Sequence, residues 1–202
     1  PVNPMNRAEE LKRYITDPDA RVAITTGDLA AELAQASNAL PSGQRLQHML
    51  VTQFTDAFDP QAPDGDAIPE AWSAWLLTRH PLPALEGGQV EAWTDALQHS
   101  GQVPACEVGG GDMALLPYTS GTTGLPKGCV HIHSSIMHNA VSGSLWSSAS
   151  AEAVVLGVVP MFHITGMVSV MHTAMYCGAT LVIMPRWDRD LAGRLISRYQ
   201  VT

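Results

Sequence analysis

The stretch that decides the fold is Tyr118-Thr119-Ser120-Gly121-Thr122-Thr123-Gly124-Leu125-Pro126-Lys127-Gly128. It follows the apolar run Met113–Tyr118, which predicts a strand. Glycines let a backbone approach a phosphate closely and turn amide N–H groups inward. Hydroxyl groups donate further hydrogen bonds to phosphate oxygens, and a lysine supplies compensating charge. The stretch therefore predicts a phosphate-binding loop after a strand.

This loop differs from the P-loop of many nucleotide-binding proteins. That pattern requires glycine directly before the lysine and serine or threonine directly after it. Here Pro126 precedes Lys127 and Gly128 follows it. The alternative is a flexible linker, but a linker explains neither the preceding strand nor the Pro-Lys-Gly ending.

The residues after the loop alternate between strand and helix patterns. Short apolar runs predict strands at Val154–Val159 and Leu181–Met184. Helices are expected over Ser134–Trp146, Ile164–Tyr176 and Leu191–Tyr199. Because each of the three expected strands, Met113–Tyr118 included, precedes a segment long enough for a helical crossover, we expect them to be parallel neighbours.

The N-terminal half predicts a similar alternation of strands and helices, followed by a loop-rich stretch. A capping-box-like start at Asn6 predicts a helix through about Ile15, and Asp28 is expected to cap another. The expected elements are strand Val22–Thr25, helix Leu29–Ala36, strand Leu46–Phe54 and, within a loop-rich stretch Thr55–Gly111, helices Glu70–Thr78 and Val90–His99. The predicted fold class is α/β, with a mainly parallel sheet and flanking helices.

Composition and charge exclude several classes of protein. The net charge of −8 argues against a sequence-independent nucleic-acid binder, which needs a basic surface. The apolar runs Ala153–Phe162 and Ala179–Met184 are shorter than the roughly 18 residues of a membrane span. The N-terminal residues do not resemble a signal peptide, and the three cysteines contain no C-x-x-C pair. We therefore expect a cytoplasmic protein that is not an integral membrane protein.

Three segments resemble the adenylate-forming superfamily, which comprises acyl-CoA synthetases, peptide-synthetase adenylation domains and firefly luciferase. The loop described above is similar to the phosphate-binding signature of these enzymes. Pro160-Met161-Phe162-His163-Ile164-Thr165-Gly166 resembles their P-x-F-H-x-x-G segment, and Val2-Asn3-Pro4 with Glu9-Glu10-Leu11 resembles a stretch early in their large N-terminal domain. The segment Gly128–His133 is closer to the acyl-CoA ligases among them.

The resemblance implies an acid–thiol ligase. A carboxylic acid, fatty or related, would react with ATP and Mg²⁺ to give an acyl-adenylate, and CoA would then accept the acyl group. The residues implied at the β- and γ-phosphates are Ser120, Gly121, Thr122, Thr123, Gly124 and Lys127. Thr119 would lie at the Mg²⁺ or at a phosphate. His163 would lie near the carboxylate or act as a gate to the acyl pocket, and Gly166 would line that pocket.

The resemblance also implies that residues 1–202 are part of the large N-terminal domain, truncated at both ends, without the small C-terminal domain. The sequence lacks a Gly-Tyr-Gly-x-Thr-Glu-like segment, a ribose-binding aspartate and a later catalytic lysine. We therefore expect these residues alone to be inactive. The alternative is a non-catalytic module that binds a nucleotide or a partner. A homodimer is compatible with these residues.

Two further residue patterns each allow two interpretations. His131 and His133 on a strand with His138 on a helix would suit a metal site, but structural or substrate-proximal imidazoles are favoured. Met167, Met171 and Met175 are spaced to share one face of a helix. Packing is the first explanation for that face, and the lining of an acyl tunnel is the second.

Overall fold

The computed structural model describes residues 1–58, 69–119 and 126–202. The chain divides into two compact units, Pro4–Pro104 and Ala105–Thr202, the second of which also includes Pro1–Asn3. Both units combine helices with parallel strands, as the α/β fold class predicts.

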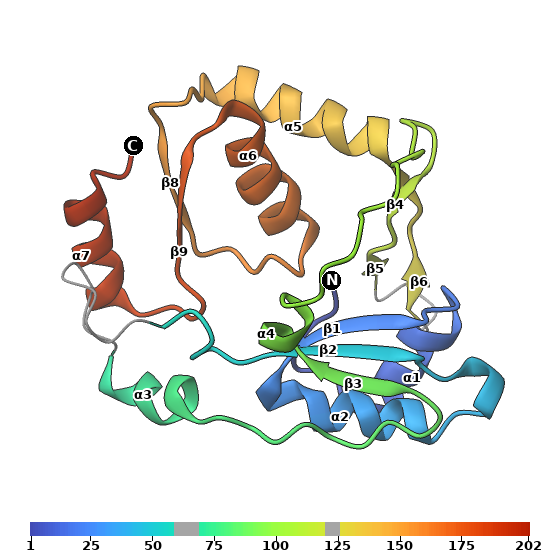
Figure 1. The fold of residues 1–202 in the computed structure, drawn as a ribbon. Coiled ribbons are helices and arrows are strands. Elements are labelled where there is room, and N and C mark those ends of the chain that lie inside the picture. Colours follow the sequence, from blue (N-terminus) through green and yellow to red (C-terminus); the bar gives the residue numbers. More distant parts are fainter. Residues whose placement is uncertain (59–68, 120–125) are drawn as a thin grey trace. The chain divides into compact units, whose positions relative to one another are not determined.

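The unit Pro4–Pro104 is built on a three-stranded parallel sheet (Figure 1). Its elements are α1 (Ala8–Thr16), β1 (Val22–Thr26), α2 (Gly27–Asn38), the 3₁₀ turn η1 (Ser42–Gln44), β2 (His48–Thr52), α3 (Glu70–Leu77), β3 (Gln89–Ala92) and α4 (Trp93–Ala96). The strands lie in the order β1-β2-β3, with Ile24 opposite Leu50 and Leu50 opposite Glu91. The expected parallel pairing of the first two strands is confirmed.

One face of this sheet forms the core with α1 and α2. Met49 and Val51 alternate along β2 and are fully buried among residues from both helices, including Ile15 and Ala34. Side chains two residues apart on a strand point to the same face, so this alternation fixes the register of β2.

The start of α1 corrects one expected cap. The N-cap residue is Arg7, and its backbone N–H donates to Glu10 Oε2 at 2.9 Å. Asn6 and Glu9, which the sequence indicated, each lie one position too early. Asp28 likewise lies in the first turn of α2, whose N-cap is Thr26.

The expectation for Val90–His99 is wrong. Gln89–Ala92 forms strand β3, and only Trp93–Ala96 is helical. The backbone of β3 pairs with the central strand β2, and these interstrand hydrogen bonds override the weak helical pattern.

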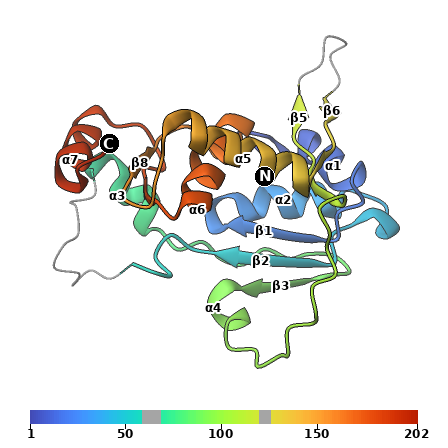
Figure 2. The ribbon, with the colours of Figure 1, turned by 90° about the horizontal axis from the view of Figure 1, so that it is seen from above.

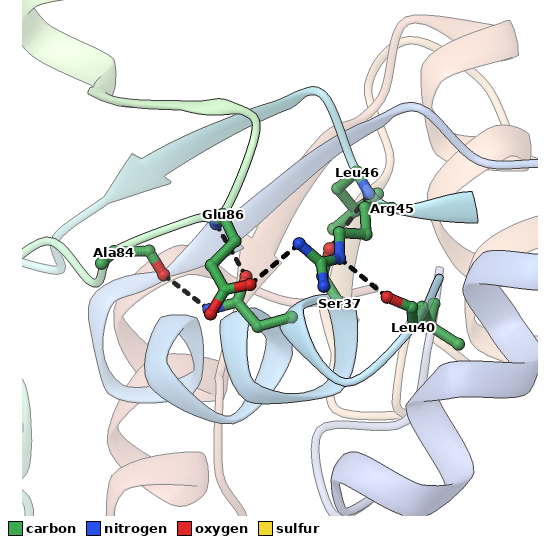
Figure 3. A network of polar contacts seen from close by, with 7 residues as sticks. Ser37, Leu40, Arg45, Leu46, Ala84 and Glu86 are labelled. Atoms are coloured by element: carbon green, nitrogen blue, oxygen red, sulfur yellow. Dashed lines mark hydrogen bonds and ion pairs between the residues drawn. The ribbon is translucent and has the colours of Figure 1, made fainter. Parts of the chain in front are cut away.

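The segment before β3 is held against α2 by a polar network (Figure 3). Asn38 donates from Nδ2 to Ala84 O at 3.0 Å and accepts from the Glu86 N–H at 2.8 Å. Arg45 pairs with Glu86 at 2.8 Å and also donates to Leu40 O at 2.7 Å. These contacts provide partners for backbone groups of Ala84 and Glu86, before β3, and of Leu40, just after α2.

The described residues of the second unit form three two-stranded sheets and a group of packed helices. Its elements are β4 (Met113–Leu115), β5 (Tyr118–Thr119), β6 (Lys127–Gly128), β7 (His131–Ile132), α5 (His133–Ser147), β8 (Val154–Gly157), the π-helix η2 (Thr165–His172), α6 (Thr173–Cys177), β9 (Thr180–Ile183) and α7 (Arg189–Tyr199). Ile136 of α5 packs with Met167 and Val168 of η2 in the core of this unit.

Of the three strands expected to be parallel neighbours, two are confirmed as such. β8 and β9 are parallel, with Val155 opposite Leu181. The run Met113–Tyr118, however, divides into β4 and β5 around Leu116-Pro117, and each part pairs antiparallel: β4 with β7, and β5 with β6. Proline has no backbone N–H to donate to a strand ladder, which is consistent with the break there.

The methionine series does not share one helical face. Met167 is 1% exposed, whereas Met175 is 70% exposed. The intervening backbone is a π-helix, in which residue i bonds to i+5. Met171, four residues after Met167, packs against the same core cluster, so packing explains Met167 and Met171 but not Met175.

Candidate phosphate- and acid-binding site

The candidate phosphate loop lies in the sequence between two strands, β5 and β6, that pair with each other. β5 and β6 run antiparallel, with Thr119 opposite Lys127 and Tyr118 opposite Gly128 (Figure 2). Directly opposed residues of an antiparallel pair have Cβ atoms about 4.5–5.5 Å apart. The paired strands thus place the side chains of Thr119 and Lys127 on the same face. Both residues are exposed.

The remaining predicted phosphate ligands, Ser120, Gly121, Thr122, Thr123 and Gly124, lie outside the described residues. The structure assigns Lys127 to strand β6 rather than to the loop itself. A lysine on a paired strand has its backbone fixed before any ligand binds, which limits the positions that its ammonium can reach.

Two contacts that sequence reasoning missed hold the base of this strand pair. A Cβ added at Gly128 would lie 3.0 Å from the Leu116 side chain, so the glycine allows that side chain to pack against the strand. The Cys129 N–H donates to Pro117 O at 2.9 Å. The glycine was visible in the motif, but nothing in the sequence indicated Leu116 as its neighbour.

His163 lies in a tight turn between β8 and η2. Its N–H donates to Pro160 O at 3.0 Å, and its carbonyl accepts from the Met167 N–H at 3.0 Å. The ring is oriented as well, because Nδ1 accepts from the Thr165 N–H at 3.2 Å. His163 is exposed, so the opposite ring nitrogen, Nε2, faces away from this backbone contact. A backbone donor of this kind leaves no signature in the sequence.

Gly166 is buried in the first turn of η2. A Cβ at this position would lie 2.3 Å from Pro160 O and 2.7 Å from Val159 O. Side-chain carbons do not approach backbone oxygens so closely, so only glycine fits. The structure therefore brings the predicted site residues together in two pairs, Thr119 with Lys127 and His163 with Gly166.

The two histidines expected on one strand, His131 and His133, do not share it. His131 is in β7, whereas His133 is the first residue of α5 and His138 follows on that helix. Within residues 1–58, 69–119 and 126–202, no group of three His, Cys, Asp or Glu side chains is placed to hold a metal ion. In the same part of the chain, no helix is both long and apolar enough to cross a membrane.

Comparisons with known proteins agree with the arrangement of these segments. The family model described as AMP-binding enzyme matches residues 1–202. The long-chain-fatty-acid–CoA ligase FadD13 of Mycobacterium tuberculosis is 42% identical over 101 residues, which are 48% of this chain and 19% of that protein. The 4-coumarate–CoA ligase 4 of Arabidopsis thaliana is 41% identical over 95 residues, covering 45% and 17%.

The fold is also that of solved structures. The apo structure of MbtA from Mycobacterium smegmatis superposes with a TM-score of 0.69 at 24% identity, covering 100% of this chain and 32% of that one. The matches to the two ligases span only 17–19% of their length. Because the family model matches the whole chain, from the N-terminal strands through β5 and β6 to α7, this chain belongs to the family of AMP-binding enzymes.

Proposed function

We propose that the chain is the ATP- and acid-binding part of the N-terminal domain of an acid–CoA ligase. In the first step a carboxylate oxygen attacks the α-phosphorus of ATP, and the bond to the bridging oxygen breaks to release pyrophosphate. In the second step the CoA sulfur attacks the acyl carbon and AMP leaves. The family model and the names of the two similar ligases support this reaction.

The observation that supports nucleotide binding most directly is the pairing of Thr119 with Lys127. Negative charge on the leaving pyrophosphate is stabilised best by donors that are positioned before the reaction. The paired strands fix the backbone of Thr119, which offers a hydroxyl, and of Lys127, which offers an ammonium. The two residues lie on either side of the segment 120–125 in the sequence. We propose that Lys127 binds the β- and γ-phosphates together with Ser120, Gly121, Thr122, Thr123 and Gly124.

Magnesium fits this site only in part. Mg²⁺ prefers oxygen ligands and is commonly held by one or two carboxylates together with substrate phosphates. Thr119 offers one hydroxyl oxygen, and the described residues contain no suitable acidic cluster. Thr119 would therefore contribute to an ion that arrives with the triphosphate.

His163 and Gly166 are proposed to contact the acid. They follow β8 closely, and ligands of parallel α/β sheets bind beyond the carboxyl ends of strands. The similar ligases act on long-chain fatty acids and on 4-coumarate. Aliphatic and hydroxycinnamic acids are therefore the substrate classes to compare first.

The test is acid-dependent release of pyrophosphate from ATP. The 202 residues alone are proposed to turn over little or no substrate, so the assay uses a protein that also contains the remaining ligase segments. Release that depends on one class of acid, followed by CoA thioester formation, is the expected result. ATP binding without acid-dependent release of pyrophosphate would instead favour the non-catalytic module.

A further inference from the structure

We propose that the buried hydroxyl of Thr173 holds η2 in its π register, and that this register determines which acids the ligase accepts. In the π register each N–H bonds to the carbonyl five residues earlier. Thr173 directly follows η2 and begins α6. Its control of the register rests on contacts within the second unit, and its effect on the acid rests in addition on the proposed function. Thr173 acts on the acid only through the helix, so it is a positioning residue.

Thr173 donates two hydrogen bonds to one carbonyl, that of Val168, five residues earlier. Its backbone N–H donates to Val168 O and is shared with Val170 O. Its hydroxyl donates to the same Val168 oxygen at 3.0 Å. In an α-helix the backbone N–H bonds four residues earlier, and a threonine hydroxyl bonds three or four residues earlier. Both bonds to Val168 are therefore specific to the wider π turn.

The hydroxyl bond lies inside the protein, in a space that a glycine leaves open. Thr173 and Val168 are each only 6% exposed. A Cβ at Gly143 of α5 would lie 3.0 Å from Thr173 Oγ1, so any side chain at Gly143 would press on the hydroxyl. Because water has little access to this carbonyl, it does not replace the hydroxyl as a donor once that group is removed.

Packing on α5 anchors the segment at both ends in a way that fits the π turn. At the start of η2, Met167 and Val168 pack with Ile136 of α5. Directly after η2, Thr173 lies against Gly143. If the N–H bonds shifted from five residues to four, one end would turn relative to the other by about 100°, the rotation per residue of an α-helix. The residues at the two ends could not then both stay against α5.

The start of η2 is the end that a change of register would move. The other end continues through α6 into β9, which is held by its parallel pairing with β8. The start follows the turn at residues 160–163 and carries Gly166, which is proposed to contact the acid. A rotation of about 100° there would replace the groups beside the acid by their neighbours in the sequence. ATP is proposed to bind at the β5–β6 pair, so its affinity should not follow the register of η2.

Scalar couplings across hydrogen bonds report the register directly in the ²H,¹³C,¹⁵N-labelled chain. The wild type should show a coupling between Thr173 N and the carbonyl carbon of Val168. Thr173→Val keeps the size of the side chain but lacks the hydroxyl, so we expect its coupling to move to the carbonyl carbon of Ser169. Thr173→Ser keeps the hydroxyl and should retain the wild-type coupling. Thr173→Ala, which differs from Thr173→Ser by the hydroxyl alone, should behave like Thr173→Val.

Ser144→Ala is the matched control. Ser144 is also 6% exposed, and its hydroxyl donates to Val141 O at 2.9 Å, three residues earlier in α5. Its removal should leave the coupling of Thr173 unchanged. A wild-type coupling to Ser169, or a coupling to Val168 that persists in Thr173→Val, would overturn the proposal. If Thr173→Val does not fold, the comparison of Thr173→Ser with Thr173→Ala decides. Unfolding of both variants that lack the hydroxyl would show a need for it in folding, and would also overturn the proposal.

Kinetics with two acids test the effect on selection in the active ligase. The ratio of kcat/KM for a long-chain fatty acid to that for 4-coumarate should change at least about tenfold in Thr173→Val. The ratio should stay near the wild-type value in Thr173→Ser, and KM for ATP should stay within about twofold in both variants. A moved coupling with an unchanged ratio would overturn the role in acid selection. A ligase without any acid-dependent activity would refute the proposed function, while the couplings would still decide whether Thr173 holds the register.

Discussion

Replacing Lys127 tests the phosphate site with little disturbance of the fold. The protein has only two lysines, Lys12 and Lys127. Lys127 is exposed on β6, so Lys127→Ala removes the ammonium without opening a cavity. Exposed substitutions of this kind change the free energy of unfolding by about 0.5 kcal/mol or less.

The loss of ATP affinity should be much larger than this change in stability. A hydrogen bond to a charged group contributes about 1.5–3 kcal/mol, and solvent at an exposed lysine favours the lower end. At about 1.4 kcal/mol for each tenfold change in Kd, we expect ATP binding to weaken about ten- to thirtyfold. Added salt should weaken ATP binding more in the wild type than in the variant, because the variant lacks the screened charge.

Calorimetric titration with ATP and urea denaturation measure the two quantities on the same samples. Lys12→Ala is the control: it removes the 2.6 Å pair with Glu9 on α1 and should leave ATP affinity unchanged. An unaltered Kd for Lys127→Ala, together with a clear loss of stability, would show that Lys127 is structural. The phosphate-binding assignment would then be refuted.

Three further changes test other parts of the structure. His163→Ala should reduce the use of the acid far more than the binding of ATP in ligase kinetics, and equal losses for both would make His163 a structural residue. Gly27→Ala should destabilise the fold by about 1–3 kcal/mol in urea denaturation, because the new Cβ would lie 2.3 Å from Gln53 Oε1, in a buried amide held by two hydrogen bonds to the His80 backbone. Gly193→Ala, in open space, should instead be neutral or stabilising by up to about 1 kcal/mol, and similar losses for both variants would refute the steric argument. Asp188→Ala should lower stability by about 1 kcal/mol, because the Asp188 carboxylate accepts the Leu191 N–H at 2.7 Å at the start of α7; an unchanged urea midpoint would show that this cap contributes nothing.

Local chemistry made several elements readable from the sequence. The β1-α2-β2 unit, helix α5, the parallel pair β8–β9 and helix α7 all lie close to the expected ranges. Short apolar runs mark the strands, and in α7 apolar residues recur at helical spacing after an Asp188 cap; those signals act over a few residues. Thr119 and Lys127 were also readable as separate candidates for phosphate or Mg²⁺ binding, because glycines and hydroxyls flank them in one short stretch.

What the sequence by itself determined is therefore the α/β class, most of the elements and the motif that indicates phosphate binding. Only the tertiary structure decided which strands pair. Gln89–Ala92 forms a strand because its backbone pairs with β2, and Met113–Leu115 pairs with β7 instead of β8. It also showed that Lys127 lies opposite Thr119 and that Gly166 allows the turn before η2 to hold His163. Strand partners and close backbone approaches join residues far apart in the chain or depend on exact dihedral angles. The energies of these pairings and close approaches therefore cannot be derived from a local pattern of residue types.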